Sequence, residues 1–169
     1  FPQPYVLDAN RCIAYLTIEH KGSIAKELRP LMGNRVFGCD DCQLACPWNR
    51  AASATQEDDF KPRHGLDQAQ LADLLTWTET EFLKRTEGSP IRRVGFEGWQ
   101  RNLAIGLGNG PATANVFVIL NHQLALATPM VKEHIEWALD QLQQRQNQNI
   151  PLTPVPLREH LGRKLKYLN

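Results

Sequence analysis

The chain has 169 residues, of which 42% are hydrophobic and 22% are charged, and its formal net charge is +1. This composition is too apolar for a disordered tail, and the length allows one ordinary hydrophobic core or two small ones. The longest apolar stretches fall far short of the ~20 residues that a membrane-spanning helix needs, so we expect no membrane segment. The first residues show neither an initiator Met nor a secretory signal, so we expect them to lie inside a longer reading frame.

Residues 1–60 are predicted to form a small module that is organised by ligands. Glycines and prolines interrupt this segment, and all four cysteines of the chain lie within it. Short helices are expected at residues 11–19 and 24–31, and loops are expected to carry Cys39 and Cys42. The small, polar and acidic residues at 51–59 are typical of an exposed connector. The boundary of the first module is therefore expected near residue 60.

Residues 61–148 are predicted to form consecutive amphipathic helices, because apolar residues recur there at helical spacing. The four apolar stripes are Leu71, Leu74, Leu75 and Phe82; Phe96, Trp99, Leu103 and Leu107; Val116, Leu120 and Leu124; and Val131, Ile135, Ala138, Leu139 and Leu142. Breaks in the pattern occur at residues 88–90, 108–111 and 128–129, where Pro lies at or near the start of the next helix. Because these connections are short, neighbouring helices should be antiparallel. Two helix pairs match a fragment of an α-solenoid. The fold class is therefore mainly α, and residues 149–169 are expected to be a basic C-terminal tail.

The cysteines form the most informative pattern in the chain: Cys12, then Cys39, Cys42 and Cys46, with Pro47 directly after the last. A disulfide framework is disfavoured because no secretory signal is present. Buried free thiols and a structural zinc site are two further interpretations, although the Cys-Pro ending fits zinc poorly. Bacterial-type ferredoxins end their ligand run with this Cys-x2-Cys-x3-Cys-Pro spacing. The pattern therefore favours iron and sulfur, and the other interpretations stay open.

The ferredoxin pattern also predicts how the ligands divide between clusters. In such runs the last cysteine binds the neighbouring cluster, so Cys12, Cys39 and Cys42 could supply three thiolates to one cluster while Cys46 reaches a second. Each cluster would then lack ligands in this chain. An upstream cysteine run, absent from these residues, would complete both.

Three blocks of the sequence resemble the epoxyqueuosine reductases: residues 5–19, residues 33–49 with the three closely spaced cysteines, and residues 91–109. The first two blocks are similar to the second ferredoxin-type cluster motif of that family, and the third to its HEAT-like repeat segment. The resemblance covers nearly the whole chain. It implies a ferredoxin-like 4Fe-4S segment followed by HEAT-like α-helical repeats, as the C-terminal part of a longer enzyme.

The same resemblance implies a cobalamin-dependent oxidoreductase that reduces epoxyqueuosine in tRNA to queuosine, with electrons passed through two 4Fe-4S clusters. By family analogy Cys12, Cys39 and Cys42 hold one cluster and Cys46 serves the other. Cobalamin would be bound mainly by the missing N-terminal part, and no residue of this chain is assigned as catalytic. The implied setting is a cytoplasmic monomer, supplied with electrons by a flavodoxin or ferredoxin. The alternative function is a helical-repeat module that binds RNA or protein and holds structural zinc.

Basic side chains gather toward the C-terminal end, since residues 1–60 carry a net charge of −2 and residues 61–169 a net charge of +3. Such clusters can contact phosphates, although solvated helix faces look the same in sequence. The candidate tRNA contacts are Arg92, Arg93, Arg101, Arg163, Lys164 and Lys166. Asn102, next to Arg101, could line a surface between helices or form a hydrogen bond between them.

Overall fold

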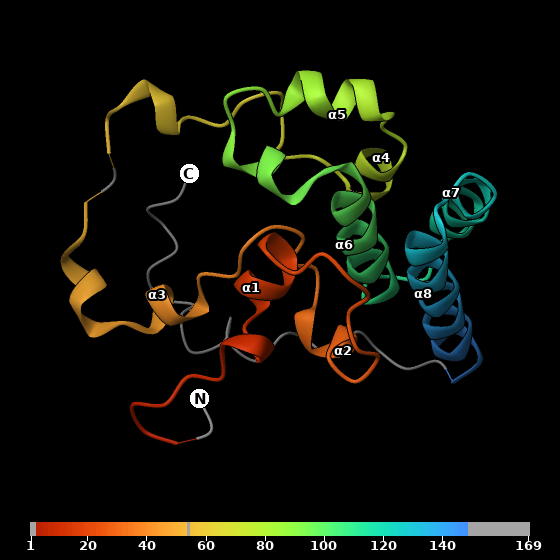
Figure 1. Ribbon diagram of the computed structural model, residues 1–169, viewed down its shortest axis with the longest axis horizontal. Helices are drawn as coiled ribbons and strands as arrows, with labels where there is room; N and C mark the ends of the chain where they lie inside the picture. Colours follow the sequence, from red (N-terminus) through yellow and green to blue (C-terminus); the bar gives the residue numbers. More distant parts are fainter. Residues whose placement is uncertain (1–2, 54, 149–169) are drawn as a thin grey trace. The chain divides into compact units, whose positions relative to one another are not determined.

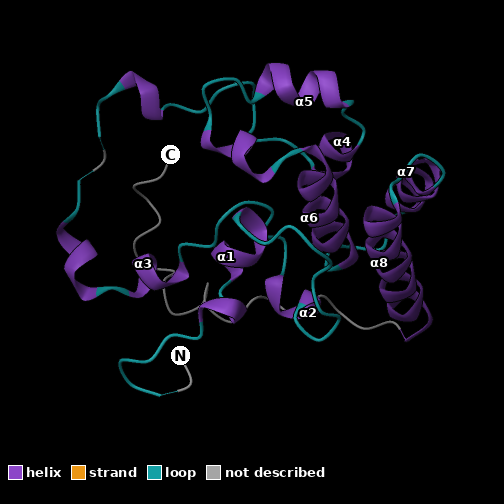
Figure 2. Ribbon diagram, viewed as in Figure 1, coloured by secondary structure: helices purple, strands orange, loops and turns teal. Residues whose placement is uncertain are grey.

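The computed structural model describes residues 3–53 and 55–148, and these are helical with connecting loops (Figures 1 and 2). No strand occurs in these residues; an isolated bridge pairs Gln3 with Val6. The expectation of a mainly α fold is confirmed. None of the described helices is both long enough and apolar enough to cross a membrane. The predicted basic tail, residues 149–169, lies outside the described residues.

The chain divides into two compact units, which differ from the modules expected from sequence. Among the described residues, the first unit combines residues 3–39 with residues 70–148, and the second contains residues 40–53 and 55–69. Residues 3–39 therefore pack with the later helices. The functional division expected from the sequence, with boundaries at residues 60 and 148, stays a prediction.

The first unit contains most of the helices. Their bounds are η1 Ala9–Arg11, α1 Ile13–Ile18, α2 Arg29–Met32, α4 Leu71–Leu75, α5 Glu79–Arg85, η4 Pro90–Val94, α6 Phe96–Gly108, α7 Ala114–Leu124 and α8 Pro129–Gln148. Helix α6 packs mainly against α8, which also contacts α7, and α4 packs against α6 and α7 (Figure 1). Because of this packing, every residue of α6 from Trp99 to Gly108 is buried, except the half-buried Gln100.

A glycine permits the close approach of α6 and α8. A Cβ atom built on Gly108 would lie 2.8 Å from both Ala138 Cα and Trp137 Cζ3. Real Cβ atoms do not approach other atoms so closely, so a side chain at this position would push the two helices apart. The core of the first unit includes fully buried aliphatic side chains: Leu103, Ile105, Leu120, Ile135 and Leu142.

Two helices differ from the sequence prediction. The apolar stripe from Leu71 to Phe82 is divided between α4 and α5, because Thr78 caps a new helix. Thr78 Oγ1 accepts from the Glu81 N–H at 3.2 Å, and Glu81 Oε2 accepts from the Thr78 N–H at 2.9 Å. The helix expected at residues 24–31 is shorter than predicted and begins at Arg29. The Ile24 backbone is engaged by side chains instead: its N–H donates to His134 Nε2, and its carbonyl accepts from Arg29 Nε.

The second unit is described at residues 40–53 and 55–69. It contains α3 Asp41–Ala45, η2 Pro47–Ala51 and η3 Asp58–Phe60. None of its described side chains is buried, and Trp48 and Phe60 are 90% and 77% exposed. This stretch has no hydrophobic core of its own, as expected for a segment that other groups must hold in place.

Candidate iron–sulfur ligand segment

Cys12 lies at the junction of two helices. It ends η1, where its N–H donates to Ala9 O at 3.1 Å, and it is the N-cap of α1, where its carbonyl accepts from the Leu16 N–H at 2.9 Å. Asp8 caps η1, because its Oδ1 accepts from the Asn10 N–H at 3.1 Å. The backbone on both sides of the half-buried Cys12 is thus held by hydrogen bonds.

Cys39 follows a glycine whose backbone N–H forms a hydrogen bond with α1. The Gly38 N–H donates to Thr17 Oγ1 at 3.0 Å, and Gly38 has a φ of +73°, in the left-handed region that favours glycine. Thr17 lies five residues after Cys12 and is fully buried. Sequence reasoning gave Thr17 no role, and its sole sequence signal is its position on the helix that follows a candidate ligand.

Polar side chains of α6 hold the segment between Cys12 and Cys39, which contains α1 and α2. Arg101 Nη1 donates to His20 O at 2.8 Å and Gly22 O at 2.7 Å, and Arg101 Nη2 donates to Leu16 O at 2.9 Å. Asn102 Nδ2 donates to Thr17 O and Val36 O, each at 2.8 Å. Both side chains are fully buried.

The burial of Arg101 corrects one sequence expectation. Its guanidinium is enclosed and donates to backbone carbonyls, so it is not available to a tRNA phosphate, and we remove Arg101 from the candidate contacts. Burial lowers the pKa of Arg101 to about 10, against an opposing effect of the Glu97 carboxylate, so the group remains charged at neutral pH. Asn102 joins separate segments by hydrogen bonds, which is the second of the two roles expected for it.

The other two cysteines belong to the second unit. Cys42 is exposed on α3, so the expectation that a loop carries it is wrong. Cys46 ends α3 and caps η2, which Pro47 begins. Local hydrogen bonds hold this turn: the Cys46 N–H donates to Gln43 O at 3.2 Å, and Asn49 Nδ2 donates to the same carbonyl at 2.9 Å. The two-residue and three-residue gaps between cysteines thus span one short helix and its ends.

The donor chemistry fits a thiolate-bound cluster. Cys12, Cys42 and Cys46 are free thiols, so the described residues form no intrachain disulfide framework, and each cysteine is partly or fully exposed. Soft thiolate donors suit iron–sulfur clusters, and a segment without a core fits a ligand-organised fold. Within the described residues, no group of three or more His, Cys, Asp or Glu side chains converges on one point. Cys12 and Cys39 belong to one unit, and Cys42 and Cys46 to the other.

The remaining basic candidates differ in their surroundings. Arg92 and Arg93 are exposed on η4, and Arg93 Nη2 forms an ion pair with Glu19 Oε1 at 2.6 Å. A phosphate would therefore compete with a carboxylate for Arg93. Arg163, Lys164 and Lys166 lie outside the described residues, so their expected tRNA contacts stay predictions.

A second polar network, which sequence reasoning missed, joins α8 to the loop after α1. Glu133 accepts from Ser23 Oγ at 2.7 Å and from Arg29 Nη2 at 2.5 Å, and these two hydrogen bonds lower its pKa to about 2. His134 Nε2 accepts a hydrogen bond from the Ile24 N–H, so this nitrogen carries no proton. The ring proton therefore lies on Nδ1, which donates to Met130 O at 2.7 Å. Burial lowers the pKa of His134 to about 4 and keeps the ring neutral.

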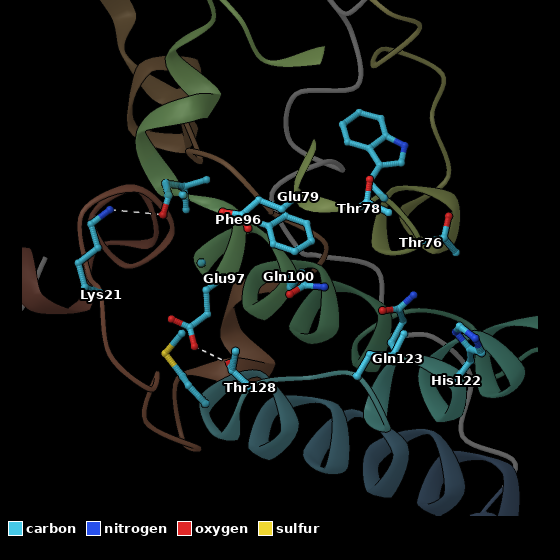
Figure 3. Close-up of a pocket in the computed structure, with 16 residues that line it drawn as sticks. Lys21, Thr76, Thr78, Glu79, Phe96, Glu97, Gln100, His122, Gln123 and Thr128 are labelled. Carbon is cyan, nitrogen blue, oxygen red and sulfur yellow. Dashed lines mark hydrogen bonds between the residues drawn. The ribbon is translucent and has the colours of Figure 1, made fainter. Parts of the chain in front are cut away.

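An open groove of about 880 Å³ lies elsewhere on the first unit (Figure 3). Lys21 lines it and donates to Val94 O, and Thr128 donates to Glu97, as the dashed lines show. None of the lining residues is a cysteine. The groove is therefore not a cluster site.

Comparison with known proteins identifies relatives for both parts of the chain. The family model described as "4Fe-4S double cluster binding domain" matches residues 1–49, which include all four cysteines. Epoxyqueuosine reductase from Pseudomonas aeruginosa is 62% identical over 139 residues, which cover 82% of this chain and 38% of that protein. Epoxyqueuosine reductase from Escherichia coli K12 is 48% identical and covers 97% of this chain. The chain spans 43% of the length of that relative.

Solved structures agree with these matches. A structure of epoxyqueuosine reductase from Bacillus subtilis is 26% identical, with a TM-score of 0.75, and covers 96% of this chain and 42% of its own. A crystal structure of epoxyqueuosine reductase with an epoxyqueuosine-modified tRNA-Tyr stem loop has a TM-score of 0.74 at 23% identity. It covers 98% of this chain and 45% of its own, and at this identity it shows a shared fold.

Proposed function

The chain belongs to the epoxyqueuosine reductase family, and we propose that it is the C-terminal part of such a reductase and relays electrons through 4Fe-4S clusters. The observation that carries this proposal is the cysteine set Cys12, Cys39, Cys42 and Cys46, which lies wholly inside the matched double-cluster segment, residues 1–49. Removal of an epoxide oxygen as water, which leaves an alkene, consumes two electrons and two protons. A 4Fe-4S cluster supplies one-electron transfer when bound.

The cysteines have distinct roles in this proposal. Cys12, Cys39 and Cys42 hold one cluster, and Cys46 contributes to the second, as in ferredoxin runs that end in Cys-Pro. The free thiols of Cys12, Cys42 and Cys46 and the coreless segment around the latter two support the assignment. The remaining ligands come from outside this chain. Cobalamin is also bound outside it, and no residue described above is assigned to the corrin or to proton transfer.

The helical segment at residues 61–148 is proposed to be HEAT-like and to help bind tRNA. The support is the packing of α8 against α6 and α7 and the related protein that was crystallised with a modified tRNA stem loop. Exposed Arg92 and Arg93 and the tail residues Arg163, Lys164 and Lys166 would contact phosphates. Such contacts position the RNA, whereas an unstacked base needs a pocket that reads it. A tRNA substrate would place the reaction in the cytoplasm, with a flavodoxin or ferredoxin as electron donor.

The alternative function, a helical binding module with structural zinc, predicts a different metal. An iron–sulfur protein is brown and contains acid-labile sulfide, whereas a zinc–thiolate protein is colourless and contains none. Metal and sulfide analysis of the anaerobically purified full-length protein separates the two. Zinc without iron or sulfide would reject the proposed cluster ligands.

Activity is tested by supplying the full-length protein with cobalamin, a reductant and tRNA that contains epoxyqueuosine, and then measuring queuosine by mass spectrometry. We expect turnover by the full-length protein and none by Cys42→Ala. Neutralising Arg92, Arg93, Lys164 and Lys166 together should weaken tRNA binding and flatten its salt dependence, by roughly 0.7 to 0.9 in slope for each phosphate that is no longer neutralised. An unchanged affinity and salt slope would show that these side chains are merely solvated.

A further inference from the structure

The hydroxyl of Thr17 connects the two cysteine segments of the first unit. Thr17 Oγ1 donates to Ile13 O at 2.7 Å within α1, which begins directly after Cys12, and accepts from the Gly38 N–H at 3.0 Å, one residue before Cys39. A hydroxyl can donate one hydrogen bond and accept others, so both contacts form together. The Thr17 side chain has no solvent exposure, and both of its hydrogen bonds are partly buried.

A second bridge joins the same two segments close to the first. Asn102 Nδ2 donates to Thr17 O and to Val36 O, each at 2.8 Å, so the amide spans α1 and the stretch before Gly38. The acceptor end of the Asn102 amide is occupied as well, because its Oδ1 accepts from Arg101 Nη2 at 2.9 Å and from Nε at 3.1 Å. The amide is thereby fixed in orientation, and α6 holds both segments from one side.

This double bridge matters because Cys12 and Cys39 are far apart in sequence. In a contiguous ferredoxin run the short gaps alone keep the ligands together, whereas here a long segment that contains α1 and α2 separates them. Ligands that are already held in place bind a metal centre without further ordering of the chain. We propose that Thr17 is a positioning residue that holds Cys12 and Cys39 as a pre-formed ligand pair, with Asn102 supporting it. This inference rests on the proposed function, since it assumes that both cysteines bind one cluster.

The chain offers a matched control in Thr86. Thr86 is also fully buried, and its Oγ1 donates to Phe82 O at 2.6 Å, four residues back, as Thr17 Oγ1 does to Ile13 O. That bond lies at the end of α5, within its own helix. Thr86→Val therefore removes a comparable buried hydroxyl without touching a cysteine segment.

The test compares Thr17→Val, Thr17→Ser and Thr86→Val in the full-length protein, purified without oxygen. Three quantities are measured: iron and sulfide per chain, the rate of iron loss to a chelator, and the electron paramagnetic resonance spectrum after reduction. Thr17→Val should lose iron from one cluster about tenfold faster, the effect of one ordinary hydrogen bond, and should alter that cluster's spectrum. Thr17→Ser, which keeps the hydroxyl, should have the rate of iron loss and the spectrum of the wild type. Thr86→Val should match the wild type in rate and spectrum, even if its melting temperature falls equally.

The outcomes separate this inference from the proposed function. If the wild type contains no iron, the proposed function itself fails, and this inference fails with it. If the wild type contains both clusters but Thr17→Val behaves like Thr86→Val, the positioning role is overturned alone. Should Thr17→Val not fold, Thr17→Ala, which lacks both the hydroxyl and the extra methyl group, is measured in its place against the same expectations.

Discussion

Replacing Arg101 by Met should destabilise the first unit strongly, although the residue lies far from the cysteines in sequence. Met keeps most of the apolar stem but removes every donor. Arg101 is fully buried and donates to the carbonyls of Leu16, His20 and Gly22. These three residues lie between Cys12 and Cys39 in the chain, so the substitution removes the anchor of that segment.

The expected loss is about 3 to 5 kcal/mol, because three backbone carbonyls lose their donor and each buried group left unpaired costs about 1 to 3 kcal/mol. The bond to Leu16 O is buried, so that carbonyl would lose its partner without replacement by water. The bonds to His20 O and Gly22 O are partly buried, so water can recover some of their energy. For a chain of this size, such a loss lowers the melting temperature by about 6 to 20 °C.

Thermal and urea unfolding, followed by circular dichroism, measure this loss. Arg92→Met is the control, because Arg92 is exposed and an exposed substitution usually changes stability by less than about 0.5 kcal/mol. Arg101→Lys should fall between the two, since one ammonium group cannot reproduce the fork of a guanidinium. If Arg101→Met and Arg92→Met unfold alike, the anchoring role of Arg101 is refuted.

Two further predictions concern α6 and α8. Gly108→Ala should lower the free energy of unfolding in urea by about 1 to 3 kcal/mol, because the new Cβ would collide with Ala138. Gly98→Ala is the control, since its nearest neighbour is the Val94 side chain, and an equal loss there would contradict this reasoning. His134 has a folded-state pKa of about 4, below its usual 6.5, so it stabilises the fold fully above pH 6.5 and loses this contribution as the pH falls toward 4. Between these values the urea midpoint should fall less steeply in His134→Gln than in the wild type; parallel curves would show that His134 is not responsible.

The candidate ligand set could be proposed from the sequence, because cluster chemistry depends on the local spacing of Cys39, Cys42 and Cys46. The long helices α6 and α8 could be predicted for a similar reason, since their apolar residues repeat with the helical period. The break between α4 and α5 was also encoded: Thr78 and Glu81 form a capping box, a signal that the apolar stripe across it obscured.

The polar core could not be predicted, since charged residues in a sequence indicate a surface unless their partners are known. Arg101 and Asn102 are adjacent polar residues in a helix, and their buried role depends on backbone carbonyls about 80 residues earlier in the chain. The late start of α2, at Arg29 instead of residue 24, also depends on a contact that is distant in sequence. His134 binds the Ile24 N–H across a separation of 110 residues, and no local pattern indicates that contact.

Iron counting in the full-length protein tests whether the cysteines divide between two clusters. Cys46→Ala and Cys12→Ala are purified without oxygen, and iron, sulfide and paramagnetic spectra are compared with the wild type. We expect each variant to lose about half of the iron, with a different cluster signal missing in each, because the two cysteines serve different clusters. Loss of the same signal in both variants, or equal loss of both clusters from Cys46→Ala with the fold intact, would contradict the crossed arrangement.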